Sequence, residues 1–400
     1  MTAPPPRIVR PRLRDLGIAI GRFPTGRDNA ITDVAGVRVG HVTKIEGEGE
    51  LIPGIGPVRT GVTAVVPAEG DVFLERVFTA SYVLNGAGEV TGLAQINEWG
   101  LCETPILLCS TLCVGRVLDA TVAWLSQLHP KIGKEYDVAI PVVAECDDSY
   151  LNDAVGRHVM QADVTEALEA ARGGAVDEGC VGAGTGMQTF HFAGGIGTSS
   201  RRVPMAGLDV AVGALVLSNF GDRDLLRVDG VPVGRLISDR FAHIPRRGPA
   251  GSIIVLVATD APLIHRQLSR LARRAALAIG RTGGYAANNS GEIVLAWSTA
   301  NRVPRLADDD PGVPRSSRSL SVRPIAPGRH MAEVVLDTEL DALFEAAVDV
   351  VEEAILNAIC AGVDMTGHSG HHAPALPLDA VAALLKQYRP PHPADPRPSS

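Results

Sequence analysis

The stretch PRRGPAGSIIVLVAT, residues 245–259, places a serine between a loop rich in glycine and proline and a strongly apolar run. The run from Ser252 to Thr259 has the length and composition of a buried β-strand, where a small polar residue is unusual. Gly251 has no Cβ, so its carbonyl can be approached closely and its backbone can adopt strained conformations. Taken alone, the Gly-Ser pair is explained more simply as the end of a loop, because turn residues commonly precede strands.

The chemistry of the same pair allows a second interpretation. If the Ser252 hydroxyl attacks the Gly251 carbonyl, the peptide becomes an ester, and hydrolysis leaves Ser252 as a chain terminus with a free α-amine. Such an amine has a pKa of about 7.7–8.0, so an appreciable fraction is neutral near pH 7 and can accept the proton of its own hydroxyl. One residue then supplies both nucleophile and base, which makes this pair a candidate self-cleavage site.

Strand-length apolar runs and helical patterns mix irregularly along the rest of the chain. In the helical segments, apolar residues recur every three or four positions and form one apolar face. This mixture favours sheets covered by helices, in an α+β or layered sandwich arrangement, over a doubly wound parallel sheet. The Gly, Pro and polar content of 239–251 and 303–328 predicts loops. The expected strands are GVTAVVP (61–67), DVAIPVV (137–143), VAVGALVLSN (210–219) and 252–259, and the expected helices are 111–128, 164–174, 261–280 and Thr338–Ala361.

Composition excludes several classes of protein. The 400 residues carry a formal net charge of -8 and no basic stripe with interleaved aromatics, so we expect no nucleic-acid partner, and a small neutral or cationic substrate fits better. No run reaches the ~18 apolar residues of a membrane span, and the N-terminus lacks the apolar segment of a secretory signal, so a cytoplasmic protein is expected. The cysteines lack the paired spacing of zinc sites and are interpreted as reduced, packed thiols: Cys102, Cys109, Cys113, Cys146, Cys180 and Cys360.

Six segments together resemble the family of L-aminopeptidase/D-alanyl-esterase-amidases and β-aminopeptidases. The similarity extends from Leu13 to Leu385, and the segments are specific as a set although each is weak alone. They are RDNAITDVAGVRVGHVT (27–43), NGAGEVTG (85–92), GTGMQTFHFAGGIGTSSR (184–201), LVLSNFGD (215–222), GSI (251–253) and NNSGEIVLAWST (288–299).

The resemblance implies a fold and a maturation step. Members of the family are made as precursors, cut themselves ahead of a serine, fold as a four-layered αββα sandwich of the N-terminal-nucleophile type and assemble into tetramers. For this sequence it implies one catalytic domain, 13–388, cut into an α chain 1–251 and a β chain 252–400, in a homotetramer of αβ units without metal or cofactor. Residues 1–12 are expected to be flexible and 389–400 disordered, since Pro and polar residues bury little apolar surface.

The resemblance also assigns catalytic roles. Ser252 becomes the nucleophile, and a downstream Ser-x-Glu pair, Ser290 and Glu292, supports it. Residues i and i+2 of a strand project from the same face, so both side chains are expected to face Ser252, with Glu292 orienting the Ser290 hydroxyl and holding the terminal ammonium. Asn219 resembles the family's oxyanion-hole asparagine. Without the resemblance, the Ser-Gly-Glu segment would be interpreted as a turn, and Asn219 equally well as a strand-end cap.

The acidic segment AECDDSY, residues 144–150, follows an expected strand. Glu145 matches an acidic position of the family's substrate pocket, where a carboxylate holds the substrate's ammonium group. Some members have a tyrosine at the position of Asp147, and Tyr150 is the candidate to supply that hydroxyl. A solvated acidic loop is the alternative for Asp147 and Asp148.

Other motifs are weaker. TGHSGHH, residues 366–372, lacks the second glycine of a nucleophile elbow. A zinc site of His368, His371 and His372 with Asp364 has neither an HExxH pattern nor a helix to support it. The strings GAGEVTG and GAGTGM lack the strand, helix and later acidic residue of a dinucleotide site, so their glycines are expected to allow close backbone approach.

These inferences predict an aminopeptidase or amidase that releases N-terminal amino acids from short peptides, amides or esters through an acyl-enzyme on Ser252. Hydrolysis of a non-peptide amide such as a pantetheine-like side chain, or acyl transfer to another amine, is the alternative on the same fold. An uncut, non-catalytic relative that binds nucleotides is the alternative from another class. Preference for α- or β-amino acids, and for L or D forms, depends on the shape of the pocket.

Overall fold

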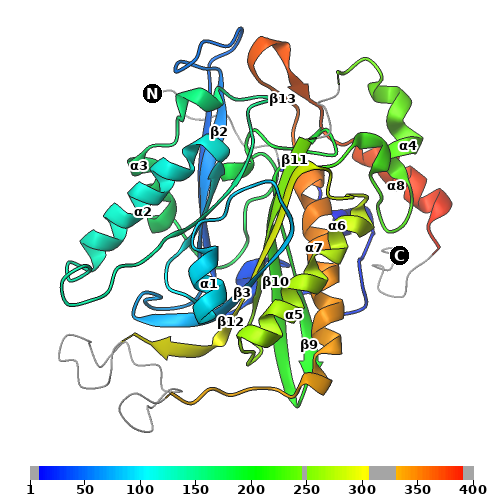
Figure 1. Cartoon of the computed structure of the whole chain (residues 1–400). Helices are drawn as coiled ribbons and strands as arrows, with labels where there is room; N and C mark the ends of the chain where they lie inside the picture. Colours follow the sequence, from blue (N-terminus) through cyan, green and yellow to red (C-terminus); the bar gives the residue numbers. More distant parts are fainter. Residues whose placement is uncertain (1–8, 246–249, 306–329, 391–400) are drawn as a thin grey trace.

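Two β-sheets lie face to face at the centre of the structure (Figure 1), a computed structural model that describes residues 9–245, 250–305 and 330–390. The smaller sheet has the order β1-β2-β5-β6, with β1 Arg38–Glu46, β2 Val58–Val66, β5 Ile106–Ser110 and β6 Val142–Cys146. The larger sheet has the order β4-β3-β12-β11-β10-β9, with β4 Leu101–Cys102, β3 Glu75–Gly86, β12 Asn289–Pro304, β11 Ala250–Thr259, β10 Leu208–Asn219 and β9 Ile196–Met205.

Helices fill many of the connections between these strands. Their bounds are α1 Leu93–Trp99, α2 Val114–Leu128, α3 Gln161–Glu169, α4 Val233–Ile237, α5 His265–Ala275, α6 Leu277–Thr282, α7 Asp341–Cys360 and α8 Leu378–Tyr388. Two small hairpins pair β7 Gln188–Thr189 with β8 Phe192–Ala193 and β13 Met365–Thr366 with β14 His372–Ala373. The strand predicted at 137–143 is wrong at its start: β6 begins only at Val142, after a proline that has no backbone N–H to donate, and Val138 and Ile140 are exposed.

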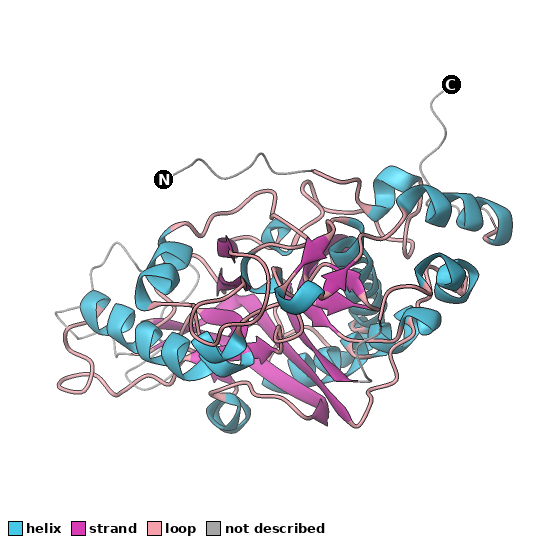
Figure 2. Cartoon of the chain, turned by 90° about the horizontal axis from the view of Figure 1, so that it is seen from above, coloured by secondary structure: helices cyan, strands magenta, loops and turns pink. Residues whose placement is uncertain are grey.

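The alternating side chains of β11 show how the layers form. Ile254 and Leu256 pack between the two sheets, whereas Ile253 and Val255 pack on the opposite face against α5 and α7. A third apolar cluster places α2 and α3 on the outer face of the smaller sheet. The four-layered αββα sandwich expected from the resemblance is therefore confirmed, and Figure 2 shows the strands at the centre with helices on both outer sides.

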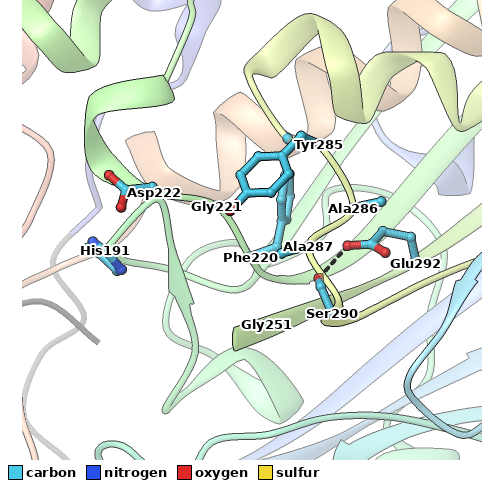
Figure 3. Close-up of a pocket in the computed structure, with 11 residues that line it drawn as sticks. His191, Phe220, Gly221, Asp222, Gly251, Tyr285, Ala286, Ala287, Ser290 and Glu292 are labelled. Atoms are coloured by element: carbon cyan, nitrogen blue, oxygen red, sulfur yellow. Dashed lines mark hydrogen bonds between the residues drawn. The ribbon is translucent and has the colours of Figure 1, made fainter. Parts of the chain in front are cut away.

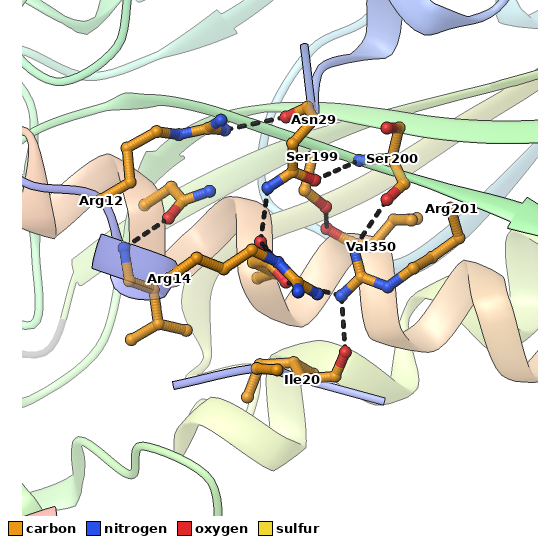
Figure 4. A network of polar contacts seen from close by, with 12 residues as sticks. Arg12, Arg14, Ile20, Asn29, Ser199, Ser200, Arg201 and Val350 are labelled. Atoms are coloured by element: carbon orange, nitrogen blue, oxygen red, sulfur yellow. Dashed lines mark hydrogen bonds and ion pairs between the residues drawn. The ribbon is translucent and has the colours of Figure 1, made fainter. Parts of the chain in front are cut away.

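A buried ionic network ties the N-terminal segment to β9 and α7 (Figure 4). Glu353 on α7 is fully buried and accepts hydrogen bonds from Arg14 at 2.9 Å, from Asn29 at 2.6 Å and from Arg201 at 2.6 Å. Arg12 forms an ion pair with Glu178 at 2.6 Å. Five charged groups and an amide thus fix the start of the chain against two elements that lie far apart in the sequence.

Several predictions fall outside the described residues. These are the flexibility of residues 1–8, the loop character of 246–249 and 306–328, and the disorder of 391–400. The domain boundaries drawn from the sequence stay predictions. In the described part of the chain, none of the helices combines the length and the hydropathy that a membrane crossing requires.

Candidate active site

Ser252 lies near the start of β11, between two neighbouring strands. It pairs with Asn219 on antiparallel β10 and with Gly291 on parallel β12. The pleat places its side chain on the same face as Ile254, toward the smaller sheet. There its hydroxyl lies against the thiol of Cys146, and only 5% of Ser252 is exposed.

Ser290 and Glu292 come together as expected from their spacing. The Ser290 hydroxyl donates a hydrogen bond to Glu292 Oε1, and both residues are buried. The sequence analysis expected both side chains to face Ser252, but Ser290 pairs with Gly251 while Gly291 pairs with Ser252. Successive residues of a strand project to opposite faces of the sheet. The Ser290–Glu292 pair therefore lies on the face of Gly251, and the Ser252 side chain lies on the opposite face.

The Ser-Glu pair borders a small cavity of about 30 Å³ against Gly251 (Figure 3). A space of this size holds one or two water molecules but no substrate, because a water needs roughly 10–15 Å³. Burial raises the pKa of Glu292, and the hydrogen bond from Ser290 opposes that rise. Among the described residues, Glu292 Oε2 has no hydrogen-bond partner, so this carboxylate can accept a further donor.

His191 and Tyr285 are among the cavity residues that had no role in the sequence analysis. His191 lies in a backbone conformation with φ of 60°, and it lines the cavity opposite the loop that carries Tyr285. The tertiary fold brings these two residues to the cavity from segments that are distant in the sequence. The motif that contains His191 is the one sequence feature that could have predicted either residue.

The amide of Asn219 is held at both ends. Its Nδ2 donates to the carbonyl of Asp147 at 2.9 Å, and its Oδ1 accepts from the backbone N–H of Gln188 at 3.0 Å. Asn219 is buried at the end of β10, directly beside Ser252. These two hydrogen bonds fix the orientation of the Asn219 amide beside Ser252.

Glu145 is the penultimate residue of β6, directly before Cys146. Its carboxylate accepts a hydrogen bond from the Glu89 backbone N–H at 2.9 Å and another from the Thr111 hydroxyl. A Cβ placed on Gly88 would lie 3.1 Å from Glu145 Oε1 and 3.6 Å from the Cα of Gly291, so Glu145 approaches the pairing partner of Ser252. Burial raises the pKa of Glu145, and the hydrogen bonds from Thr111 and Glu89 oppose that rise.

Tyr150 lies in different surroundings. Its ring stacks on His371 with centroids 4.4 Å apart, and it packs against the small apolar cluster that contains Leu151 and Met365. These contacts attach the ring to the β13–β14 hairpin. A role in substrate binding stays a prediction for Tyr150.

The sequence analysis did not predict the surroundings of Asp148. The alternative of a solvated loop is wrong for Asp148, which is fully buried and accepts side-chain hydrogen bonds from Thr60, Ser110 and Asn152. Asp147, by contrast, is only partly buried. No local pattern separates these two adjacent aspartates, because two of the three donors to Asp148, Thr60 and Ser110, come from distant strands.

The weaker motifs have structural explanations. In the described part of the chain, no group of three or more His, Cys, Asp or Glu side chains could hold a metal ion. His368 and His371 hydrogen-bond the backbone carbonyls of Ser149 and Tyr150 at 3.0 and 2.7 Å. The glycines of GAGTGM allow close backbone contact, since a Cβ on Gly184 would lie 2.5 Å from the Ile196 nitrogen. All six cysteines are free and buried.

A serine near the start of a central strand, in an αββα sandwich and beside a hydroxyl–carboxylate pair, defines the class of N-terminal-nucleophile-type hydrolases. Comparisons with known proteins agree. The chain is 42% identical to the beta-peptidyl aminopeptidase BapA of Sphingosinicella microcystinivorans, over 95% of this chain and 93% of the relative.

Solved structures give the same result. A Burkholderia sp. beta-aminopeptidase superposes with a TM-score of 0.81 at 41% identity, covering 95% of this chain and all of the other. The L-aminopeptidase D-Ala-esterase/amidase of Ochrobactrum anthropi, a serine aminopeptidase with a variant of the Ntn hydrolase fold, gives 0.82 at 40% identity, covering 95% and 99%. Residues 29–373 match peptidase family S58. The chain belongs to this family, and it is a hydrolase of the aminopeptidase/amidase type.

Proposed function

We propose that the chain cuts itself between Gly251 and Ser252, and that the freed Ser252 is the nucleophile of a serine aminopeptidase. The observation that carries the proposal is the register of β11. It places Asn219 beside Ser252 on one side and the Ser290–Glu292 pair beside Gly251 on the other. Asn219 and the Ser290–Glu292 pair therefore flank the peptide bond that would be cut.

Maturation would proceed in two steps. The Ser252 oxygen bonds to the Gly251 carbonyl carbon, the peptide C–N bond breaks, and the hydroxyl proton passes to the departing nitrogen. Water then hydrolyses the ester, which leaves a carboxylate on Gly251 and restores the Ser252 hydroxyl. The water-sized cavity against Gly251, with a buried Glu292 carboxylate on its wall, supports delivery of that water.

In the mature enzyme, the same groups would act on a substrate carbonyl in place of the Gly251 carbonyl. The α-amine of Ser252 takes the proton of its own hydroxyl, which attacks the substrate carbonyl to form an acyl-enzyme. Asn219 donates to the developing oxyanion, a contribution whose loss typically costs ~10²–10³ in turnover. Glu292 and Ser290 position the amine, and water releases the acyl group.

The buried carboxylate of Glu145 supports a substrate with a free N-terminal ammonium group, because it lies next to the pairing partner of Ser252. We propose short peptides, amides or esters as substrates, including those that begin with a β-amino acid, as in the names of the relatives. The processed protein would comprise chains 1–251 and 252–400 in a cytoplasmic tetramer of αβ units.

Mass spectrometry of denatured protein tests the proposal. Purified wild type should yield fragments 1–251 and 252–400, the latter beginning Ser-Ile-Ile-Val, and should hydrolyse L-, D- or β-aminoacyl p-nitroanilides. Ser252→Ala should abolish both scission and hydrolysis. Ser199→Ala is the matched control, since Ser199 is a buried strand serine that donates to the Val350 carbonyl at 2.7 Å. A fragment beginning elsewhere, or full amidase activity in Ser252→Ala, contradicts the proposal.

A further inference from the structure

The tripeptide Cys146-Asp147-Asp148 joins the two sheets beside the candidate site. The thiol of Cys146 lies against the Ser252 hydroxyl, and the carbonyl of Asp147 accepts from Asn219 Nδ2 at 2.9 Å. The side chain of Asp148 makes its hydrogen bonds within and beside the smaller sheet. Two consecutive residues thus contact the candidate nucleophile and oxyanion donor, and the third anchors them.

The anchor consists mainly of hydrogen bonds to the Asp148 carboxylate. Oδ2 accepts from the Thr60 hydroxyl at 2.6 Å, and Oδ1 accepts from the Ser110 hydroxyl at 2.7 Å and from Asn152 Nδ2 at 3.1 Å. The carbonyl of Asp148 also accepts the backbone N–H of Leu151 and of Asn152, which closes the turn after it. An ionised carboxylate accepts at both oxygens, so this set of donors suits the charged form.

We propose that Asp148 is a positioning residue that sets the direction of the Asn219 amide. Its ionised carboxylate holds the tripeptide against Thr60 and Ser110, so that the carbonyl of Asp147 keeps the amide of Asn219 aimed at the developing oxyanion. The inference rests on the proposed function, in which Asn219 binds that oxyanion. Neutralising the carboxylate loosens the anchor and lowers turnover without removing a substrate contact.

The anchor responds to pH in the mildly acidic range. Burial raises the pKa of Asp148 to about 6, although the hydrogen bonds from Thr60, Ser110 and Asn152 oppose the rise. Turnover should therefore fall as pH drops through this range, where the carboxylate becomes protonated. The other titratable groups close to it are the adjacent Asp147 and three thiols whose pKa burial raises, so that they are neutral near pH 6: Cys109, Cys113 and Cys146.

Ser110→Ala and Thr60→Val test the proposal without changing the charged residue. Each removes one hydrogen bond to the ionised form, so the pKa of Asp148 should rise further. We expect the acidic limb of the kcat–pH profile to move upward by about one pH unit, with KM unchanged. Asp148→Asn should lose that limb and lower kcat by roughly tenfold, a fraction of the effect of deleting an oxyanion donor.

Ser81→Ala is the matched control. Ser81 donates to Asn97 at 2.8 Å on the exposed side of β3, so its removal should leave the limb in place. Glu145→Gln checks whether the limb belongs to Glu145 instead, whose pKa is also raised by burial. Scission is verified by mass spectrometry before each profile is measured.

The outcomes separate this inference from the function on which it rests. The role of Asp148 is overturned if the acidic limb stays in place in both donor variants, or if it moves only in Glu145→Gln. The proposed function survives either result, provided that the processed enzyme remains active. If Asp148→Asn fails to fold, the two donor variants still decide the question.

Discussion

A methyl group at position 251 should hold the chain in its uncut form. An ideal Cβ on Gly251 would lie 2.5 Å from the carbonyl oxygen of Asn219 and 2.8 Å from the Cα of Phe220, whereas ordinary contact begins at 3.4 Å. Both atoms are backbone atoms, so no side-chain rotation relieves the contact. Strands β10 and β11 must therefore separate by about 0.9 Å, the difference between 3.4 and 2.5 Å.

This separation falls where Asn219 pairs with Ser252. Overpacking of this kind costs about 1–3 kcal/mol of folding free energy, which a domain of this size can tolerate. A displacement near 1 Å in a reacting group costs on the order of 10² in rate. Gly251→Ala should therefore fold but cut itself about a hundredfold more slowly than wild type.

The assay follows the appearance of the 252–400 fragment after purification, by denaturing gel and intact mass, together with a thermal melt. Gly280→Ala on α6 is the matched control, because a Cβ there meets nothing within 4 Å. It should cut at the wild-type rate. Scission of Gly251→Ala at the wild-type rate, or equal slowing of both variants, would refute the steric reasoning.

Three further predictions follow from the charged groups. Glu292→Gln should lower the apparent pKa of the Ser252 amine and reduce turnover by ~10²–10⁴, measured as kcat/KM against pH on processed protein; an unmoved profile counts against its role. Arg201→Met should lower the free energy of unfolding, measured in urea, by about 3–5 kcal/mol, because it leaves the fully buried Glu353 without this partner. Arg22→Met removes one partner of an exposed ion pair and should leave the free energy of unfolding unchanged. Burial alone would raise the pKa of Glu353, but its arginine partners hold that pKa below the ordinary 4.5. The stability of the wild type should therefore fall as the pH drops below 4.5. Thermal melts at a series of pH values measure this loss, which should be smaller in Arg201→Met. EDTA should leave activity unchanged, and a loss restored by Zn²⁺ would contradict the metal-free mechanism.

Local sequence accounts for much of the architecture. The apolar run from Ser252 to Thr259 predicts β11 because eight residues without a charge can be buried on both faces. The spacing of Ser290 and Glu292 predicts that their side chains meet, since a strand has a period of two, and they do. The layered arrangement followed from the mixture of strands and helices together with the family resemblance.

The relation between these pieces depends on tertiary structure. The register of β11 on β12 aligns Ser290 with Gly251 rather than with Ser252, and a shift of one residue would move every side chain to the other face. Asp148 is buried because its donors Thr60 and Ser110 lie 88 and 38 residues away in the chain. Register and burial are set by contacts between segments that are distant in the sequence. A local pattern can therefore predict that a residue lies on a strand, but it cannot predict which residues surround its side chain.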